Sequence, residues 1–170
     1  MKQNTMSLPG ELTKSATFSP CRRWRYDLWR RWGKGDYCMF IGLNPSTADE
    51  TQNDPTIRRC INFARDWGYD ALCMTNLFGF RATDPRVMKE VSHPQGPENV
   101  ATIRRLAEDA GIVVAAWGVH GVHRMQNQRV VNALKDVCEL KCLGQTKDGH
   151  PKHPLYIPKA TKPQPYIWHA

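Results

Sequence analysis

Polar side chains able to bind a ligand or position a water occur in three parts of the sequence. The apolar run over residues 39–43 ends in Asn44, and a second apolar run over residues 71–78 contains Asn76. The third candidate is His153, which lies in a Pro-rich tail. A carboxamide can accept a hydrogen bond from water or read the edge of a ligand, and a histidine can donate to an oxygen on which charge develops.

Each of these residues has an ordinary structural explanation when it is taken alone. An asparagine after a strand is most often a turn residue, and a histidine in a Pro-rich tail is most often solvated. Convergence of the three indicates a site: the loops at residues 44–49, 76–84 and 150–156 are expected to meet at the carboxyl edge of a parallel sheet, where ligands bind in such folds. His150 competes with His153 for a role in the third loop.

Several familiar catalytic and cofactor patterns are absent from the sequence. Ser46 lies in Gly-Leu-Asn-Pro-Ser and not in G-x-S-x-G, so we discount acyl transfer. Neither G-x-x-x-x-G-K-[ST] nor G-x-G-x-x-G occurs, which argues against a nucleotide triphosphatase or a dinucleotide enzyme. The six cysteines form no C-x-x-C pair, and Cys138 and Cys142 lack further ligands nearby. We therefore expect free thiols, no metal and no cofactor.

Alternating strand and helix signals predict an α/β fold, a three-layer αβα sandwich around a mainly parallel four-stranded sheet, with an N-terminal β-hairpin. The predicted strands cover residues 39–43, 71–78, 112–118 and 138–143, and the predicted helices cover 55–67, 99–110 and 129–137. Residues 22–32 alternate bulky and polar side chains and end at Gly33-Lys34-Gly35, which predicts a hairpin into the first core strand. We expect one domain over residues 18–170, preceded by a flexible arm or edge extension at residues 1–17.

The chain of 170 residues has 24 lysines and arginines against 16 aspartates and glutamates, a net charge of +8. This balance favours a polyanionic partner, with DNA as the first candidate, although a basic surface also serves solubility alone. Arginines are dense in residues 22–32, where one face of the hairpin could contact phosphate. No long apolar span and no signal sequence is visible, so we expect a cytoplasmic protein outside the membrane, with a monomer as the default.

Four motifs resemble the uracil-DNA glycosylase superfamily, and they occur in that superfamily's order. They are Gly42-Leu43-Asn44-Pro45-Ser46, Thr75-Asn76-Leu77-Phe78-Gly79-Phe80-Arg81, Val113-Val114-Ala115-Ala116-Trp117-Gly118 and His153-Pro154-Leu155-Tyr156. The first is similar to the turn that carries a water-positioning asparagine, and the last to the His-Pro pair that faces the base. Three features depart from the superfamily: the four cluster-binding cysteines of its thermophile-type branch are absent, no serine follows His153-Pro154, and Asp49 and Asp54 add carboxylates whose place in its pattern is open.

From about Trp24 to Tyr156, the chain also resembles an uncharacterised bacterial and phage family, domain of unknown function 1643. The resemblance rests on the sequences G-L-N-P-S-T-A-D at residues 42–49 and R-A-T-D-P at residues 81–85. This second resemblance implies no activity.

The glycosylase resemblance implies that a modified or mismatched base is flipped out of DNA and that its N-glycosidic bond is hydrolysed. Asn44 would orient a water, Asp49 would act as base or stabilise the cationic sugar, and His153 would donate to the departing base. The other expected base contacts are Asn76, Phe78, Phe80, Pro45, Ser46 and Tyr156, and the expected phosphate contacts are Arg22, Arg23, Arg25, Arg30, Arg81 and Lys152. The alternatives are a module that binds a base or nucleotide without cutting it, and a protein whose loops are only turns and whose basic surface docks RNA or protein.

Overall fold

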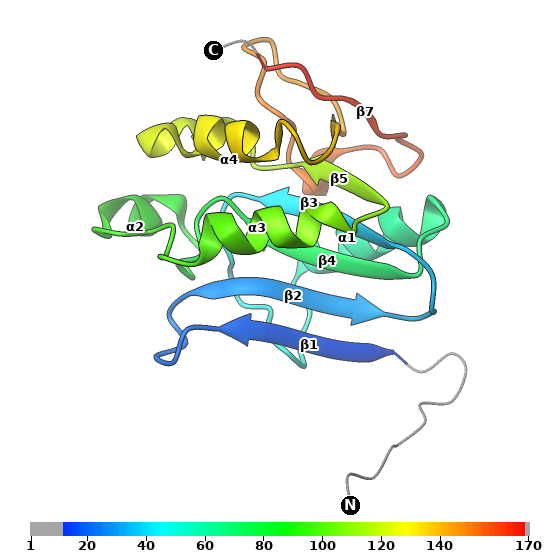
Figure 1. The fold of residues 1–170 in the computed structure, drawn as a ribbon, viewed down its shortest axis with the longest axis horizontal. Coiled ribbons are helices and arrows are strands. Elements are labelled where there is room, and N and C mark those ends of the chain that lie inside the picture. Colours follow the sequence, from blue (N-terminus) through cyan, green and yellow to red (C-terminus); the bar gives the residue numbers. More distant parts are fainter. Residues whose placement is uncertain (1–11, 169–170) are drawn as a thin grey trace, which may run out of the picture.

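Within residues 12–168, which the computed structural model describes, the chain forms a seven-stranded sheet with helices on both faces (Figure 1). The strands are β1 (Thr13–Phe18), β2 (Arg25–Arg31), β3 (Tyr37–Gly42), β4 (Ala71–Asn76), β5 (Ile112–Ala115), β6 (Leu140–Cys142) and β7 (Gln164–Pro165). Their order across the sheet is β1-β2-β4-β3-β5-β6-β7. The mixed α/β class expected from the sequence is confirmed.

The strands at the four apolar runs pair in parallel in the middle of the sheet. β3 lies between β4 and β5 and is parallel to both, and β6 continues the parallel arrangement beyond β5. Every residue of β3 after Tyr37 is buried, which explains an apolar run without alternation. The sheet is wider than the predicted four strands because β1, β2 and β7 add antiparallel strands at its edges.

The N-terminal hairpin has different partners from those predicted. β2 pairs antiparallel with β1 and with β4, so the turn at Gly33-Lys34-Gly35 does not join neighbouring strands. Most residues of β2 are buried, and such a strand requires a neighbour on each side. Of the expected N-terminal arm, residues 1–11 lie outside the described part of the chain, whereas Thr13–Phe18 forms β1 at the edge of the sheet.

The helices predicted from residues 55 and 99 begin there, whereas the third, predicted from residue 129, begins three residues earlier, at Gln126. The α-helices are α1 (Pro55–Asp66), α2 (Pro85–Glu90), α3 (Asn99–Glu108) and α4 (Gln126–Leu134), and two 3-10 helices are η1 (Val119–Met125) and η2 (Pro154–Tyr156). Asp54 caps α1 by accepting the Ile57 N–H at 2.9 Å, and Pro55 takes the first helical position. Asp84-Pro85 uses the same signal to start the short α2, a helix that was not predicted. No helix in the described residues has the length and apolar character needed to cross a bilayer.

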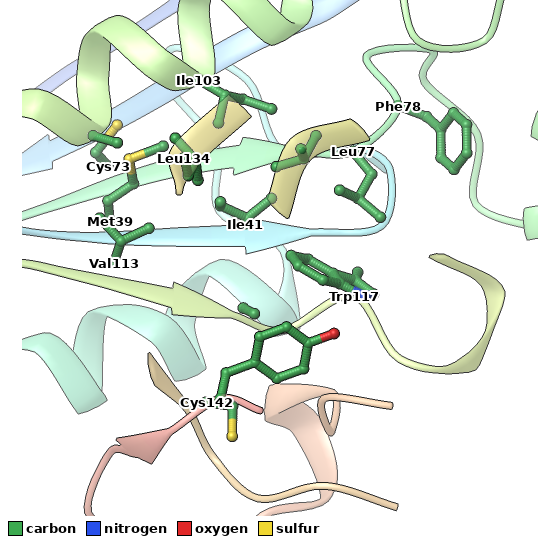
Figure 2. Close-up of a cluster of buried hydrophobic side chains, with 14 of the residues drawn as sticks. Met39, Ile41, Cys73, Leu77, Phe78, Ile103, Val113, Trp117, Leu134 and Cys142 are labelled. Atoms are coloured by element: carbon green, nitrogen blue, oxygen red, sulfur yellow. The ribbon is translucent and has the colours of Figure 1, made fainter. Parts of the chain in front are cut away.

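Successive residues of the central strands fill two hydrophobic cores on opposite faces of the sheet. Met39 and Ile41 of β3 pack with Ile103 of α3 and Leu134 of α4, as Figure 2 shows, while Phe40 packs on the opposite side against residues of α1. Full burial of a side chain of this size stabilises the fold by about 1.5–3 kcal/mol. The sheet packs between the two cores as the middle layer. This packing holds the carboxyl ends of the strands, and therefore the loops that follow them, in place.

Candidate functional site

A cavity of about 900 Å³ opens at the carboxyl ends of the parallel strands. Its wall combines the loop after β3, the last residue of β4, the segment after β5 and the residues around η2. The volume falls in the range of pockets that enclose whole small molecules, about 300–1,000 Å³. Among the residues that the sequence analysis singled out, those lining the cavity are Arg25, Asn44, Pro45, Ser46, Asn76, Lys152, His153 and Tyr156.

Asn44 has a carboxamide whose donor side is paired and whose acceptor side is free of partners among residues 12–168. Its Nδ2 donates to the main-chain oxygens of Ala82 at 2.7 Å and Pro45 at 3.2 Å. These bonds fix the orientation of the amide, because only the nitrogen can donate. Within the described residues nothing donates to Oδ1, which leaves this oxygen able to accept a hydrogen bond from water.

Asn76 lines the cavity with a carboxamide whose hydrogen-bonding capacity is unused. The residue is 2% exposed, and its Nδ2 is buried without a hydrogen-bond partner in the described chain. Leaving such a donor unpaired costs about 1–3 kcal/mol. The amide fits against Gly42, where an added Cβ would lie 2.8 Å from Oδ1. This donor is available to an acceptor that a ligand or a water supplies.

His153 is held as a hydrogen-bond donor at the cavity wall. Its Nδ1 accepts the Leu155 N–H at 3.2 Å and caps η2, so the proton of the neutral ring is assigned to Nε2. Burial lowers the pKa of His153, an effect that the Asp54 carboxylate opposes. The ring is therefore neutral at pH 7. His150 packs beside Trp168, with ring centroids 5.9 Å apart, and is not part of the cavity wall.

Arg25 and Asp54 place a buried charge of each sign at the cavity. Arg25 donates from Nη1 to the main-chain oxygen of Ala48 at 2.9 Å, and its Nε has no partner in the described chain. Burial lowers the pKa of Arg25 to about 10, which still leaves the guanidinium charged at neutral pH. Asp54 accepts from the N–H groups of Ile57 and Ala48. Arg25 was expected on an exposed phosphate-binding face. It is instead part of the cavity wall.

Asp49, predicted as the catalytic carboxylate, is not in the cavity wall. It accepts from the main-chain N–H groups of Gln52 at 2.8 Å and Thr51 at 2.9 Å, and these bonds lower the pKa of its carboxyl. The side chain thus stabilises its own loop, as Asp residues commonly do in turns. Asp54, whose role the sequence left open, is the carboxylate that lines the cavity.

Two other expected contacts are buried in structural roles. Phe78 is fully buried in the core on the α3 and α4 face, where no base could stack on it. Arg30 is also fully buried, and its guanidinium donates to Asn53 Oδ1 and to the main-chain oxygens of Asp49 and Gln52. Arg30 therefore holds the loop before α1 and has no exposed face for a phosphate.

The remaining predicted residues line the cavity or a second hollow. Tyr156 is 87% exposed at its wall, an unusual position for a large aromatic ring. Phe80 lines a second hollow of about 480 Å³, together with the phosphate candidates Arg22, Arg23 and Arg81. Ser46 borders both hollows, and its hydroxyl lies 3.1 Å from that of Thr83.

His120 is a cavity residue that the sequence analysis missed. Its Nδ1 lies 2.9 Å from the Lys89 Nζ, so that the neutral ring accepts from the ammonium. Burial and the Lys89 charge lower the pKa of His120. Its position in the sequence could have identified it, because His120 comes two residues after the Trp117-Gly118 pair that ends the third apolar run.

No group of three or more His, Cys, Asp or Glu side chains in residues 12–168 is arranged to hold a metal ion. The six cysteines are all free. Burial raises the pKa of Cys38, Cys60 and Cys73, so these thiols behave as small apolar side chains of the core.

Comparison with known proteins identifies the family and no individual relative. Searches of curated proteins and of solved structures find no match. A family model described as a protein of unknown function, DUF1643, matches residues 25–155, which is more than half of the 170-residue chain. The match includes both of the signatures on which the family resemblance rested. The chain therefore belongs to the DUF1643 family.

Proposed function

We propose that this protein is a DNA glycosylase-like enzyme, which accepts a flipped base in the cavity and hydrolyses its N-glycosidic bond. The observation that carries the proposal is the unpartnered amide of Asn76 in the same cavity wall as Asn44 Oδ1 and the neutral ring of His153. The resemblance of these three positions to the glycosylase motifs supports the same assignment.

The three side chains suit the edge of a pyrimidine. Asn76 offers a donor and an acceptor side by side, the complement of a carbonyl next to a ring N–H. His153 adds a donor for the second carbonyl. The exposed ring of Tyr156 is available for stacking on a neighbouring base, and such stacking is worth about 1–3 kcal/mol per base.

The chemistry follows from where charge develops. When the carbon–nitrogen bond breaks, its electron pair leaves with the base while the sugar becomes cationic. His153 Nε2–H would stabilise the oxygen of the departing base, a contribution of about 3 kcal/mol for one good donor. Asn44 Oδ1 would orient the attacking water, and the Asp54 carboxylate would stabilise the cationic sugar. The proton lost by the water restores neutrality of the base.

One observation favours the second candidate, a module that binds a base or nucleotide without cutting it. Both carboxylate oxygens of Asp54 already accept main-chain N–H groups, at 2.9 Å from Ile57 and 3.4 Å from Ala48. A carboxylate engaged in this way already has a structural role as the cap of α1. Under this alternative the cavity recognises the same ligand, but the bond stays intact.

The test is release of free base, detected by mass spectrometry, from DNAs that carry uracil, hypoxanthine, mismatches or phage-type modified pyrimidines. His153→Asn retains a side chain that can cap η2 but removes the Nε2 donor, so it separates chemistry from folding. We expect this variant and Asn44→Ala to bind DNA but lose base release. The matched control is His93→Asn, at an exposed histidine outside the cavity, which should release base normally.

Base release that is unchanged in both cavity variants would refute the catalytic assignment. Binding of DNA by the wild-type protein without release from any substrate would instead favour the recognition module.

A further inference from the structure

We propose that the second hollow binds a phosphodiester of a nucleic-acid strand, next to the nucleotide whose base enters the cavity, and that Glu50 occupies this site in the free protein. Its lining includes Arg22, Arg23, Phe80 and Arg81, and we call it the arginine groove. The inference rests on the proposed function, since a base in the cavity must carry its strand with it.

The arginine groove and the cavity are neighbours with a common wall. Ser46, Thr47, Ala82 and Thr83 line both of them. These residues form two segments bridged by the Ala82 N–H, which donates to the Pro45 oxygen at 2.9 Å. A ligand in the cavity that extends across this wall therefore reaches the arginines directly.

The local fold gathers three arginines in the groove, of which only Arg22 has a carboxylate partner among the described residues. The guanidinium groups of Arg22 and Arg81 lie over the ring of Phe18, at 4.0 Å and 4.8 Å from its centroid. Arg81 Nε is buried without a partner in the described chain, and the exposed Arg23 side chain donates to no described residue. A phosphate bound in the groove would supply a counter-charge and acceptor oxygens to these guanidinium groups.

Arg22 is held in this position by its backbone. Its φ of 61° lies in the left-handed region, which is unfavourable for a residue with a side chain. The turn is closed by the Arg22 N–H, which donates to the Ser19 oxygen at 2.8 Å. Because glycine adopts this conformation without cost, Arg22→Gly removes the guanidinium and leaves the turn intact.

The Glu50 carboxylate occupies the position beside Arg22 that a bound phosphate would take. Its two carboxylate oxygens accept from Arg22 Nη2 at 2.8 Å and 3.0 Å, while both side chains are about half exposed, 51% for Arg22 and 41% for Glu50. An exposed pair of this kind is weak, so a phosphate can displace the carboxylate. The loop of Glu50 is anchored by Arg30, which limits the change to a swing of the side chain.

The experiment measures binding of a short single-stranded DNA of unmodified bases by fluorescence anisotropy at several salt concentrations. Arg22→Gly and Arg23→Ala should each reduce the slope of log K against log salt by about 0.7, the value for one phosphate contact on a single strand. Glu50→Gln should tighten binding about two- to fivefold, the equilibrium equivalent of one exposed ion pair.

The matched controls are Arg104→Ala and Asp136→Asn, which break a surface pair of similar geometry with an Arg104 to Asp136 distance of 2.9 Å. Both residues lie outside the groove, so we expect the wild-type salt slope and affinity.

Unchanged slopes in both groove variants, or no binding of the oligonucleotide by the wild-type protein, would overturn the proposal. Tighter binding by Asp136→Asn equal to that of Glu50→Gln would overturn the role of Glu50.

A deoxynucleoside monophosphate is titrated in parallel: if only its affinity falls in the variants, the groove takes a free nucleotide and the strand is excluded. The expected slopes without base release would contradict glycosylase activity but support phosphate binding in the groove. Base release with unchanged slopes would contradict only phosphate binding in the groove.

Discussion

Replacing Asn76 by alanine should abolish function with almost no loss of stability. The wild-type Nδ2 is buried without a partner, and an unsatisfied donor of this kind costs about 1–3 kcal/mol. Alanine removes that cost, and the space it leaves joins the open cavity, so no closed void forms in the core. We expect the free energy of unfolding to change by less than about 1 kcal/mol, because lost packing offsets the relief.

Asn99 is the matched control for Asn76, because it has the same side chain, is also buried and also has one amide atom, Oδ1, without a partner in the described chain, whereas its Nδ2 is paired. Its Nδ2 donates to the main-chain oxygens of Asn76 at 2.7 Å and Leu77 at 2.9 Å. Asn99→Ala leaves these buried oxygens short of a donor, at about 1–3 kcal/mol for each unsatisfied group. Leu77 keeps a bond from Gln126 at 3.3 Å, so we expect a total loss of about 2–4 kcal/mol.

Thermal unfolding and urea titration distinguish the two asparagines. For a chain of this size, each kcal/mol corresponds to about 2–4 °C in Tm, so a difference of about 3 kcal/mol separates the variants by about 6–12 °C. Base release and DNA binding are measured on the same preparations, where Asn76→Ala should lose release while it remains folded. Equal destabilisation of the two variants would refute the reasoning, since it would mean that the Asn76 amide is satisfied in the folded protein.

Three further predictions follow from the same geometry. Gly42→Ala should displace the Asn76 amide, because the new Cβ would lie 2.8 Å from its Oδ1, and should reduce base release while costing about 1–3 kcal/mol in urea unfolding. Arg30→Lys should cost about 2–4 kcal/mol, since an ammonium cannot span the four oxygens that the guanidinium binds, and an altered salt slope of DNA binding would contradict the structural role of Arg30. Burial lowers the pKa of His153 below its unfolded value of about 6.5, so its contribution to stability is present above about pH 6.5 and is lost as the pH falls through the folded pKa. Compared with the wild type, His153→Asn should lose less stability between about pH 7 and pH 5, and equal losses by urea titration would contradict this.

The α/β class and the positions of the main helices could be predicted because they depend on local patterns. β3 is apolar throughout since both of its faces are covered, and α1 begins at an Asp-Pro capping signal. Both signals are contained in a few consecutive residues. The edge of the sheet at which Asn44 and Asn76 meet follows from the parallel order of such units.

The choice between similar residues could not be made in this way. Asp49 and Asp54 are five residues apart in one loop, and both can cap a turn, yet the cavity wall contains only Asp54 of the two. His150 and His153 have similar Pro-rich surroundings in the sequence, but only His153 lines the cavity. The difference depends on which side of a loop packs against distant elements, and no local pattern contains that information.

The sequence by itself determined the family, the α/β class and the edge of the sheet that carries polar side chains, because apolar periodicity and capping are read from neighbouring residues. Only the tertiary structure decided which of those side chains share a cavity. The insertion of β2 beside β4 buries Arg25 and Arg30, which the sequence had placed at the surface. Burial depends on the order of strands in the sheet, and strand order is set by contacts between residues far apart in the chain.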